Sequence, residues 1–379
     1  MSQAVEGLRE LPLRPELVGQ LPYGAPQLDV PVQLNVNENP YAPSAKIVAD
    51  IAAAVARVAA GLNRYPDREC LALRAELARY LATDSAVELG PEQLWPANGS
   101  NEIMQQLLQA FGGPGRTALS FAPTYSMYPE YARNTHTEWV TGHRDADFGI
   151  DLAEAERLIE QWQPSVLFLA SPNNPTGTAL PVEDLRRLLA IAPGVVVVDE
   201  AYAEFRRAGV PSALELLADY PRLIVTRTMS KAFALAGGRL GYLAASAAVV
   251  DAVRIVRLPY HLSAVSQATA LAALANSAEL LAGVEALRIE RDATVSWLRD
   301  AGLRVAETDA NFVLFGRFAD RHAIWQGLLD QGVLIRETGP EGWLRVSIGT
   351  SDEMRAFRLA LLQLLPAGTP AAQRTGEST

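Results

Sequence analysis

Short apolar runs alternate with amphipathic stretches through the middle of the chain. Three runs, at 165–170, 195–198 and 223–226, are apolar at nearly every position, as strands are when a parallel sheet buries both of their faces. Between the first two lies 182–191, where apolar residues recur at the three- and four-residue steps of a helix. This alternation predicts an α/β domain built on a large, doubly wound and mostly parallel sheet.

A second, smaller α+β domain is predicted further along the chain. The run at 240–245 follows Thr226 too closely for the crossover of about a dozen residues that a parallel strand needs, so we expect it to be antiparallel. A long helical stretch at 266–298 comes next. Strand-like runs follow it at 311–315, 333–336 and 343–348.

These patterns divide the chain into four segments. Five prolines interrupt residues 1–35, which predicts an extended N-terminal arm. The large domain is then expected at 36–260 and the small domain at 261–366. Residues 367–379 mix Gly, Pro, Ser, Thr and Ala with charged residues, which predicts a flexible tail.

Composition and charge exclude several classes of protein. Of the 379 residues, 33 are Lys or Arg and 43 are Asp or Glu, which leaves a net charge of −10 and no basic run for a nucleic-acid partner. No apolar stretch approaches the roughly 18 residues of a membrane span, and the first residues lack a signal peptide's basic and apolar regions. One cysteine, Cys70, and four histidines allow neither an internal disulfide nor zinc-type ligand spacing. We therefore expect a cytoplasmic protein with no membrane or nucleic-acid partner and no bound metal.

Only two lysines, Lys46 and Lys231, are present among the 33 basic residues. Ser44 can cap a helix over 44–60, which places Lys46 in the first turn as a solvated residue. Lys231 is therefore the candidate for any chemistry that needs an amine.

Polar residues gather where the three buried strands end. Because the carboxyl ends of parallel strands meet at one edge of a sheet, where ligands bind, we expect these side chains to lie close together. The residues concerned are Asn174, Asp199, Tyr202, Thr228, Ser230, Lys231 and Arg239.

This set matches a cofactor with an aldehyde, a basic ring nitrogen and a phosphate, and pyridoxal 5′-phosphate has all three. Lys231 would bind the aldehyde covalently, and Asp199 would pair with the ring nitrogen to keep the ring electron-withdrawing. Ser230 and Arg239 would bind the phosphate. The sequence therefore predicts a pyridoxal-phosphate site.

A second phosphate-binding feature lies upstream. A glycine turn precedes the amphipathic helix at 102–111, so the amides of Ser100 and Asn101 would point at an anion from the helix N-terminus. Tyr125, after the apolar run at 118–121, offers an aromatic face for the cofactor ring.

These motifs resemble those of the class II aminotransferases of fold type I. The segment Thr-Met-Ser-Lys-Ala-Phe-Ala-Leu-Ala-Gly at 228–237 is similar to the family's cofactor-attachment pattern. Asn-Glu-Asn-Pro (37–40), Leu-Asn-Arg-Tyr-Pro (62–66) and Ser-Pro-Asn-Asn-Pro-Thr-Gly (171–177) also occur in family order. Within the family the chain resembles the histidinol-phosphate aminotransferases, on Leu-Pro-Tyr-Gly (21–24), Leu-Pro-Tyr-His-Leu-Ser (258–263) and Leu-Arg-Val-Ser-Ile-Gly-Thr (344–350).

The resemblance implies a role for each candidate residue in a cofactor-binding large domain. Lys231, Asp199 and Tyr202 would be the catalytic residues. Asn174 and Tyr202 would hydrogen bond the cofactor's ring hydroxyl, and Tyr125 would stack on its ring. The cofactor phosphate would lie against Ser100, Asn101, Thr228, Ser230 and Arg239.

Substrate-binding residues are implied at both ends of the chain. Arg345 projects from the strand face opposite Leu344 and its apolar neighbours, and the resemblance places it where the family grips a substrate carboxylate. Arg336, at the end of the apolar run at 333–336, would also need an anion, although an ion pair with an acidic residue of the chain would satisfy this arginine nearly as well. Asn37 would also contact substrate.

A homodimer is implied by the same resemblance. Tyr65 would contact the cofactor phosphate of the other subunit, and Tyr23 would reach the substrate there. The N-terminal arm that carries Tyr23 would then lie against the neighbouring subunit.

The reaction implied is the reversible exchange of an amino group in histidine biosynthesis. L-histidinol phosphate and 2-oxoglutarate would give L-glutamate and 3-(imidazol-4-yl)-2-oxopropyl phosphate, also called imidazole acetol phosphate. The same motifs fit an aromatic or broad-specificity aminotransferase and, more remotely, a phosphoamino-acid decarboxylase. A non-catalytic, cofactor-binding regulator is a further alternative, but such regulators usually append a basic DNA-binding domain, for which residues 1–35 leave no room.

Overall fold

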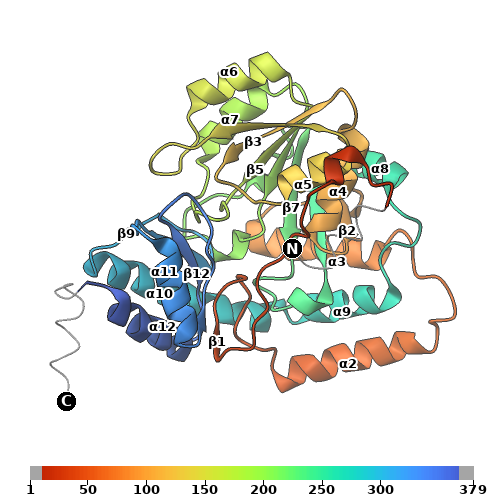
Figure 1. Cartoon of the computed structure of the whole chain (residues 1–379). Helices are drawn as coiled ribbons and strands as arrows, with labels where there is room; N and C mark the ends of the chain where they lie inside the picture. The colour runs from red at the N-terminus through yellow and green to blue at the C-terminus, as the bar shows by residue number, and fades with distance from the viewer. Residues whose placement is uncertain (1–10, 367–379) are drawn as a thin grey trace.

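The computed structural model describes residues 11–366, and its largest element is a seven-stranded sheet with helices on both faces (Figure 1). The strand order is β2-β8-β7-β6-β5-β3-β4, and β8 alone runs antiparallel to its neighbours. The strands are β2 (Leu94–Ala97), β3 (Thr117–Ala122), β4 (Glu138–His143), β5 (Val166–Ala170), β6 (Val195–Asp199), β7 (Leu223–Thr228) and β8 (Gly241–Ala245).

The predicted strands and their directions are confirmed in this sheet. The three apolar runs form β5, β6 and β7, which are parallel neighbours, and the fourth forms the antiparallel β8. The short link between β7 and β8 explains the reversal, because a parallel return needs a longer crossover. α7 (Val182–Ile191) occupies the whole predicted helical stretch between β5 and β6.

Alternate residues of the strands enter two separate cores. On β5, Leu167 and Leu169 pack on one face, while Val166 and Phe168 pack on the other. One core is covered by α3 (Leu71–Ser85), α6 (Leu152–Trp162) and α7, and the other by α4 (Ser100–Phe111), α5 (Tyr128–Asn134) and α8 (Ala247–Val256). This covering explains why the runs are apolar at nearly every position.

A smaller group of strands lies toward the C-terminal part of the chain. β12 (Leu344–Ser347), β10 (Phe312–Gly316) and β9 (Arg304–Val305) form a three-stranded antiparallel sheet in that order. β11 (Val333–Leu334) is shorter than the predicted run and pairs in parallel with β1 (Val32–Gln33) from the N-terminal region. α11 (Arg321–Asp330) and α12 (Ser351–Leu364) pack beside these strands.

The helical stretch predicted at 266–298 is wrong as a single helix. It is divided into α9 (Ala264–Ala275) and α10 (Ser277–Asp300), which meet at an angle of 71°. Asn276 lies at the break, where its side chain donates to the carbonyl of Ala272 and accepts from Lys46. An asparagine side chain competes for nearby backbone groups in this way, so asparagine is less favourable inside a helix than at its end.

Among residues 11–366, no single helix is long and apolar enough to cross a membrane, and only the bent pair α9 and α10 reaches that length and composition together.

The N-terminal region begins with little regular structure. A short 3-10 turn, η1 (Pro15–Leu17), and β1 are its only regular elements between residues 11 and 43. Ser44 caps the N-terminus of α2 (Ala45–Ala59), because its Oγ accepts from the amide of Ile47 at 3.3 Å. Lys46 is exposed in the first turn, as the sequence predicts, and the structure adds an ion pair with Asp50.

Short 3-10 turns make up the remaining regular structure of the described chain: η2 (Pro91–Gln93), η3 (Ala203–Phe205), η4 (Ala213–Leu216) and η5 (Ala236–Gly238). The predicted tail at 367–379 and the first ten residues of the arm lie outside the described residues. The domain boundaries at 35 and 260 stay predictions, although β1 joins the N-terminal region to the small group of strands.

Candidate active site

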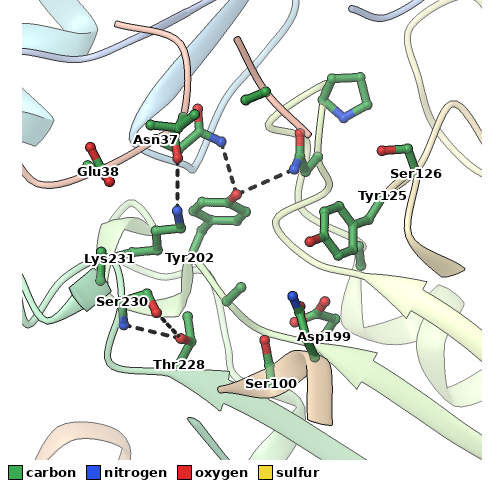
Figure 2. Close-up of a pocket in the computed structure, with 18 of the residues that line it drawn as sticks. Asn37, Glu38, Ser100, Tyr125, Ser126, Asp199, Tyr202, Thr228, Ser230 and Lys231 are labelled. Carbon is green, nitrogen blue, oxygen red and sulfur yellow. Dashed lines mark hydrogen bonds between the residues drawn. The ribbon is translucent and has the colours of Figure 1, made fainter. Parts of the chain in front are cut away.

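A cavity of about 450 Å³ lies at the carboxyl ends of the parallel strands. Side chains from β6, β7 and the N-terminal segment point into it from different sides (Figure 2). Every site residue that the sequence predicts lines this cavity except Tyr65. The topology thus brings together residues that are more than 300 positions apart in the chain, such as Tyr23 and Arg345.

Lys231 follows β7 and extends toward the N-terminal segment (Figure 2). Its Nζ donates a hydrogen bond to the carbonyl of Val36 at 2.9 Å. Burial lowers the pKa of Lys231 to about 8, and the nearby cations Arg345 and Arg239 contribute to the fall. A lysine amine with a lowered pKa is neutral, and therefore nucleophilic, closer to physiological pH.

Asp199 ends β6 and is only 7% exposed. One carboxylate oxygen accepts from the hydroxyl of Tyr128 at 2.9 Å, and the other accepts from the hydroxyl of Thr226 at 3.2 Å. Burial raises the pKa of Asp199 to about 6, and these two hydrogen bonds oppose that rise. A buried carboxylate at this edge is suited to pair with a cationic ring nitrogen.

Neither hydroxyl partner of Asp199 is among the residues predicted from the sequence. Tyr128 lies three residues after Tyr125, in a segment whose aromatic residues the sequence does not distinguish. Thr226 lies directly opposite Asp199 in the register of β6 and β7, which the apolar pattern of the two runs does not report.

The phenol of Tyr202 is held by two amides at the centre of the cavity. Nδ2 of Asn37 donates to the Tyr202 hydroxyl at 3.0 Å, and Nδ2 of Asn174 approaches it at 3.5 Å (Figure 2). The ring of Tyr202 packs edge-on against Phe312. Asn37 is 2% exposed and also accepts from Ser347, so it positions Tyr202, and its contact with substrate stays a prediction.

Hydroxyl groups and a guanidinium converge at the N-terminus of α4. Oγ1 of Thr228 donates to Oγ of Ser230 at 3.0 Å, and Nη1 of Arg239 lies 3.5 Å from the same oxygen. Gly99 precedes the helix with φ of 82°, and a Cβ there would lie 2.8 Å from Nη2 of Arg239. The first amides of α4, including those of Ser100 and Asn101, have no partner within the helix. This arrangement is a typical phosphate-binding site.

A second anion-binding region lies across the cavity, where Arg345 and Arg336 are joined by a backbone bridge. Arg345 is 6% exposed, and its guanidinium lies over the ring of Phe312 at 5.1 Å. Its Nη2 donates to the carbonyl of Asn35 at 2.9 Å, and its Nε has no hydrogen-bond partner among residues 11–366. Burial lowers the pKa of Arg345 to about 10, although this value still leaves it charged.

Neither arginine forms an ion pair with a carboxylate among residues 11–366. The structural ion pair considered for Arg336 is therefore absent within the described chain. Two guanidiniums that line a cavity without an acidic partner are suited to an anionic ligand.

Three predicted tyrosines lie in different settings. Tyr125 lines the cavity and packs edge-on against Tyr128 with ring centroids 5.4 Å apart. Tyr23 lines the cavity of its own chain, where the Ser126 hydroxyl lies 3.4 Å from its phenol oxygen, whereas the resemblance implies a position in the other subunit. Tyr65 is 78% exposed and stacks on Tyr260 away from the cavity. The roles of Tyr23 and Tyr65 across subunits stay predictions.

The donor set of the cavity fits pyridoxal 5′-phosphate. Lys231 supplies an amine for the aldehyde, and Asp199 supplies a buried carboxylate for the ring nitrogen. The phosphate matches the hydroxyls and the guanidinium at the start of α4, where Gly99 leaves the space that a larger residue would fill. All three features lie in one cavity, with Tyr202 between the lysine and the aspartate (Figure 2).

Comparison with known proteins agrees with this site. The family described as aminotransferase class I and II matches residues 30–361. Histidinol-phosphate aminotransferase 3 of Burkholderia lata is 62% identical over 358 residues, covering 94% of this chain and 97% of the relative. The histidinol-phosphate aminotransferase of Thermobifida fusca is 63% identical over 355 residues, covering 93% and 95%.

A solved structure shows the same fold. The histidinol-phosphate aminotransferase of Sinorhizobium meliloti, in complex with pyridoxal 5′-phosphate, superimposes with a TM-score of 0.76 at 24% identity, covering 88% of this chain and 91% of that one. The predicted fold type I architecture is confirmed. This chain belongs to the class I and II aminotransferases and, within them, to the histidinol-phosphate aminotransferases.

Proposed function

We propose that this chain is a pyridoxal-phosphate-dependent aminotransferase that exchanges an amino group between L-histidinol phosphate and 2-oxoglutarate in histidine biosynthesis. The observation that carries the chemistry is the placement of Lys231 and Asp199 in one cavity with a phosphate-binding site. The substrate assignment is supported by relatives that are more than 60% identical over almost the whole chain.

Each residue of the cavity would have a separate role toward the bound cofactor. The bound cofactor supplies an electron-withdrawing ring that stabilises negative charge at the substrate's α-carbon. Lys231 would hold the cofactor through its Nζ, and its amine would move a proton to and from the substrate's α-carbon. Asp199 keeps the ring nitrogen protonated. Tyr202, held by Asn37 and Asn174, donates to the ring hydroxyl.

Arg345 and Arg336 would bind the anionic end of each substrate in turn. Histidinol phosphate presents a phosphate, and glutamate presents a carboxylate, so both would use the same pair of guanidiniums. The pair suits a dianion because neither arginine has an acidic partner within residues 11–366. Bidentate contacts also fix the orientation of the substrate above Lys231.

A test of the reaction follows the visible spectrum of the cofactor-loaded protein during the first half-reaction. Histidinol phosphate should convert the cofactor to its aminated form at much lower concentration than phenylalanine does. If phenylalanine is preferred, the chain is an aromatic aminotransferase of the same fold. Lys231→Ala should remove the conversion while Lys46→Ala, at the other lysine, should leave it unchanged. Conversion by the Lys231 variant at the wild-type rate would overturn the assignment.

We also infer a homodimer whose subunits complete each other's sites. The support is the resemblance, together with large exposed apolar side chains beside Tyr65. Leu62 is 54% exposed, Leu258 is 72% exposed, and Tyr65 stacks on Tyr260. The cytoplasmic location stays a prediction from the sequence.

Mixing two inactive variants tests the shared site. If Tyr65 serves the other subunit, a mixed dimer of Lys231→Ala with Tyr65→Ala has one site with both defects and one intact site. Activity should therefore return on subunit exchange, to at most half of the wild-type value per mixed dimer, because one of its two sites is intact. No recovery from a mixture shown to contain mixed dimers would place Tyr65 in its own subunit's site.

A further inference from the structure

The carboxylate of Asp199 is held by two hydroxyl groups that lie behind the cavity. Tyr128 donates to one oxygen at 2.9 Å and Thr226 to the other at 3.2 Å. Asp199 lines the cavity, whereas the residues that line it include neither hydroxyl partner. The two hydroxyls therefore hydrogen bond to the carboxylate from the side that faces away from the cavity.

Packing leaves both donors little freedom to move. Tyr128 is completely buried, and its ring stacks on Phe168 with centroids 4.9 Å apart and an interplanar angle of 12°. Thr226 is also completely buried, and it pairs with Asp199 in the register of β6 and β7. Because one donor comes from a helix and the other from a neighbouring strand, together they fix the plane of the carboxylate.

Burial and a neighbouring carboxylate favour protonation of Asp199, so the two donors are needed to keep its carboxylate ionised. Burial raises its pKa most, and the neighbouring carboxylate of Glu200 raises it further, while the hydroxyls of Tyr128 and Thr226 lower it. The phenols of Tyr125, Tyr131 and Tyr202 also face this carboxylate, and burial raises the pKa of each. These phenols are therefore uncharged near neutral pH.

Tyr128 remains a donor over the same range of pH. Burial and the proximity of Asp199 hold the pKa of its phenol well above the ordinary value. The buried guanidinium of Arg144 lies close enough to interact with Tyr128. A neutral phenol that donates to a carboxylate stabilises the ionised form of that carboxylate.

We propose that Tyr128 and Thr226 are positioning residues that act through Asp199, keeping its carboxylate ionised and aimed at the ring nitrogen of the cofactor. This inference rests on the proposed function, because it assigns the ring nitrogen as the partner of Asp199. Without either hydroxyl, Asp199 would take up a proton closer to neutral pH. A protonated Asp199 would no longer hold a proton on the ring nitrogen.

The test measures binding of pyridoxal 5′-phosphate to the cofactor-free full chain as a function of pH, followed by quenching of tryptophan fluorescence. Tyr128→Phe and Thr226→Val each remove one hydroxyl and keep most of the buried shape. We expect each variant to shift the acid limb of binding upward by about one pH unit. Binding should weaken about twofold at pH 7 and about tenfold below pH 6, where Asp199 of the wild type also begins to take up a proton, and it should recover at higher pH. Tyr131→Phe, on the same helix, should leave the profile unchanged.

A second background separates positioning from general support of the fold. In Asp199→Asn the side chain no longer ionises, so adding Tyr128→Phe should cause no further loss of cofactor binding. An equal loss in both backgrounds, or wild-type acid limbs in both Tyr128→Phe and Thr226→Val, would overturn the proposal. If Tyr128→Phe does not fold, Thr226→Val decides by the same measurement. Failure of the wild-type chain to bind the cofactor would instead contradict the proposed function.

Discussion

The Nζ of Lys231 donates a hydrogen bond to the carbonyl of Val36, at 2.9 Å, across 195 positions of sequence. Val36 lies just beyond β1, which pairs with β11 from the C-terminal part of the chain. The N-terminal segment therefore orients the amine of Lys231 beyond the end of β7. Burial, together with the cations Arg345 and Arg239, outweighs the opposing charge of Glu38 and lowers the pKa of Lys231 to about 8.

The two lysines should differ sharply in their response to pH. In the cofactor-free protein, labelling of Lys231 by an amine-reactive reagent should be half-maximal near pH 8, because burial lowers its pKa to about 8. Labelling of Lys46 should continue to rise above pH 10.5, because its hydrogen bond to Asp50 raises its pKa from 10.5. Mass spectrometry of the two lysine peptides gives both curves in one experiment. Coincident curves would contradict this electrostatic description of the cavity.

Arg345→Lys should weaken both substrates together. Lysine keeps the positive charge but loses the planar pair of donors that binds an anion bidentately, so kcat/KM should fall about 100-fold. The measurement compares histidinol phosphate with glutamate as amino donors. Arg355→Lys is the matched control, since Arg355 is exposed and pairs only with Asp352 in the described structure. Loss with only one of the two donors would show that the substrates use separate anion sites.

Gly99→Ala should weaken binding of the cofactor phosphate. Its φ of 82° disfavours any residue with a Cβ, and that Cβ would lie 2.8 Å from Nη2 of Arg239. Displacement of Arg239 removes one charge-assisted contact, which should raise the cofactor dissociation constant about tenfold. Gly24→Ala is the control, because a Cβ at Gly24 meets no atom within 4 Å. Equal dissociation constants for the two variants would place the phosphate elsewhere.

A buried ion network behind the site should be important for stability. Arg227 is 1% exposed and contacts Glu200 at 2.9 Å and Asp84 at 2.8 Å. Arg227→Met leaves the buried carboxylate of Glu200 with only Arg206 of the described chain, at 3.5 Å, as a cation, which should lower the free energy of unfolding by about 3–5 kcal/mol. Urea denaturation measures the loss, and Arg355→Met on the surface should change it little.

Neutralising a carboxylate of this network gives a further check. Because Glu200 is buried and Arg227→Met removes the closer of its two cationic partners in the described chain, adding Glu200→Gln should recover part of the lost stability. If the double variant is less stable by the sum of both single losses, the cost would come from packing rather than from the unpaired charge.

Much of the large sheet and most of the candidate site could be predicted from the sequence. Runs of residues apolar at every position report a strand buried on both faces, so β5, β6 and β7 were found with their directions. The polar residues after those runs had to meet, because parallel strands end at one edge. The scarcity of lysine in the chain was enough to single out Lys231.

Elements whose form depends on contacts with distant residues could not be predicted. The helix predicted at 266–298 breaks at Asn276, whose side chain bonds to the Ala272 carbonyl and to Lys46 and Asp50 on α2, and periodicity reports none of these contacts. β11 is short because it pairs with β1 over only two residues, and β1 comes from the N-terminal region of the chain.

The sequence by itself determined which residues carry the chemistry, because local pattern and residue type decide what can follow a buried strand. Only the tertiary structure decided the pKa values and the hydrogen bonds of those groups. The hydroxyls of Tyr128 and Thr226 on Asp199, and the burial that lowers the pKa of Lys231, arise from packing between separate elements. Acid strength depends on the distances to neighbouring charges and on the exclusion of water, and these quantities exist only once the chain is folded.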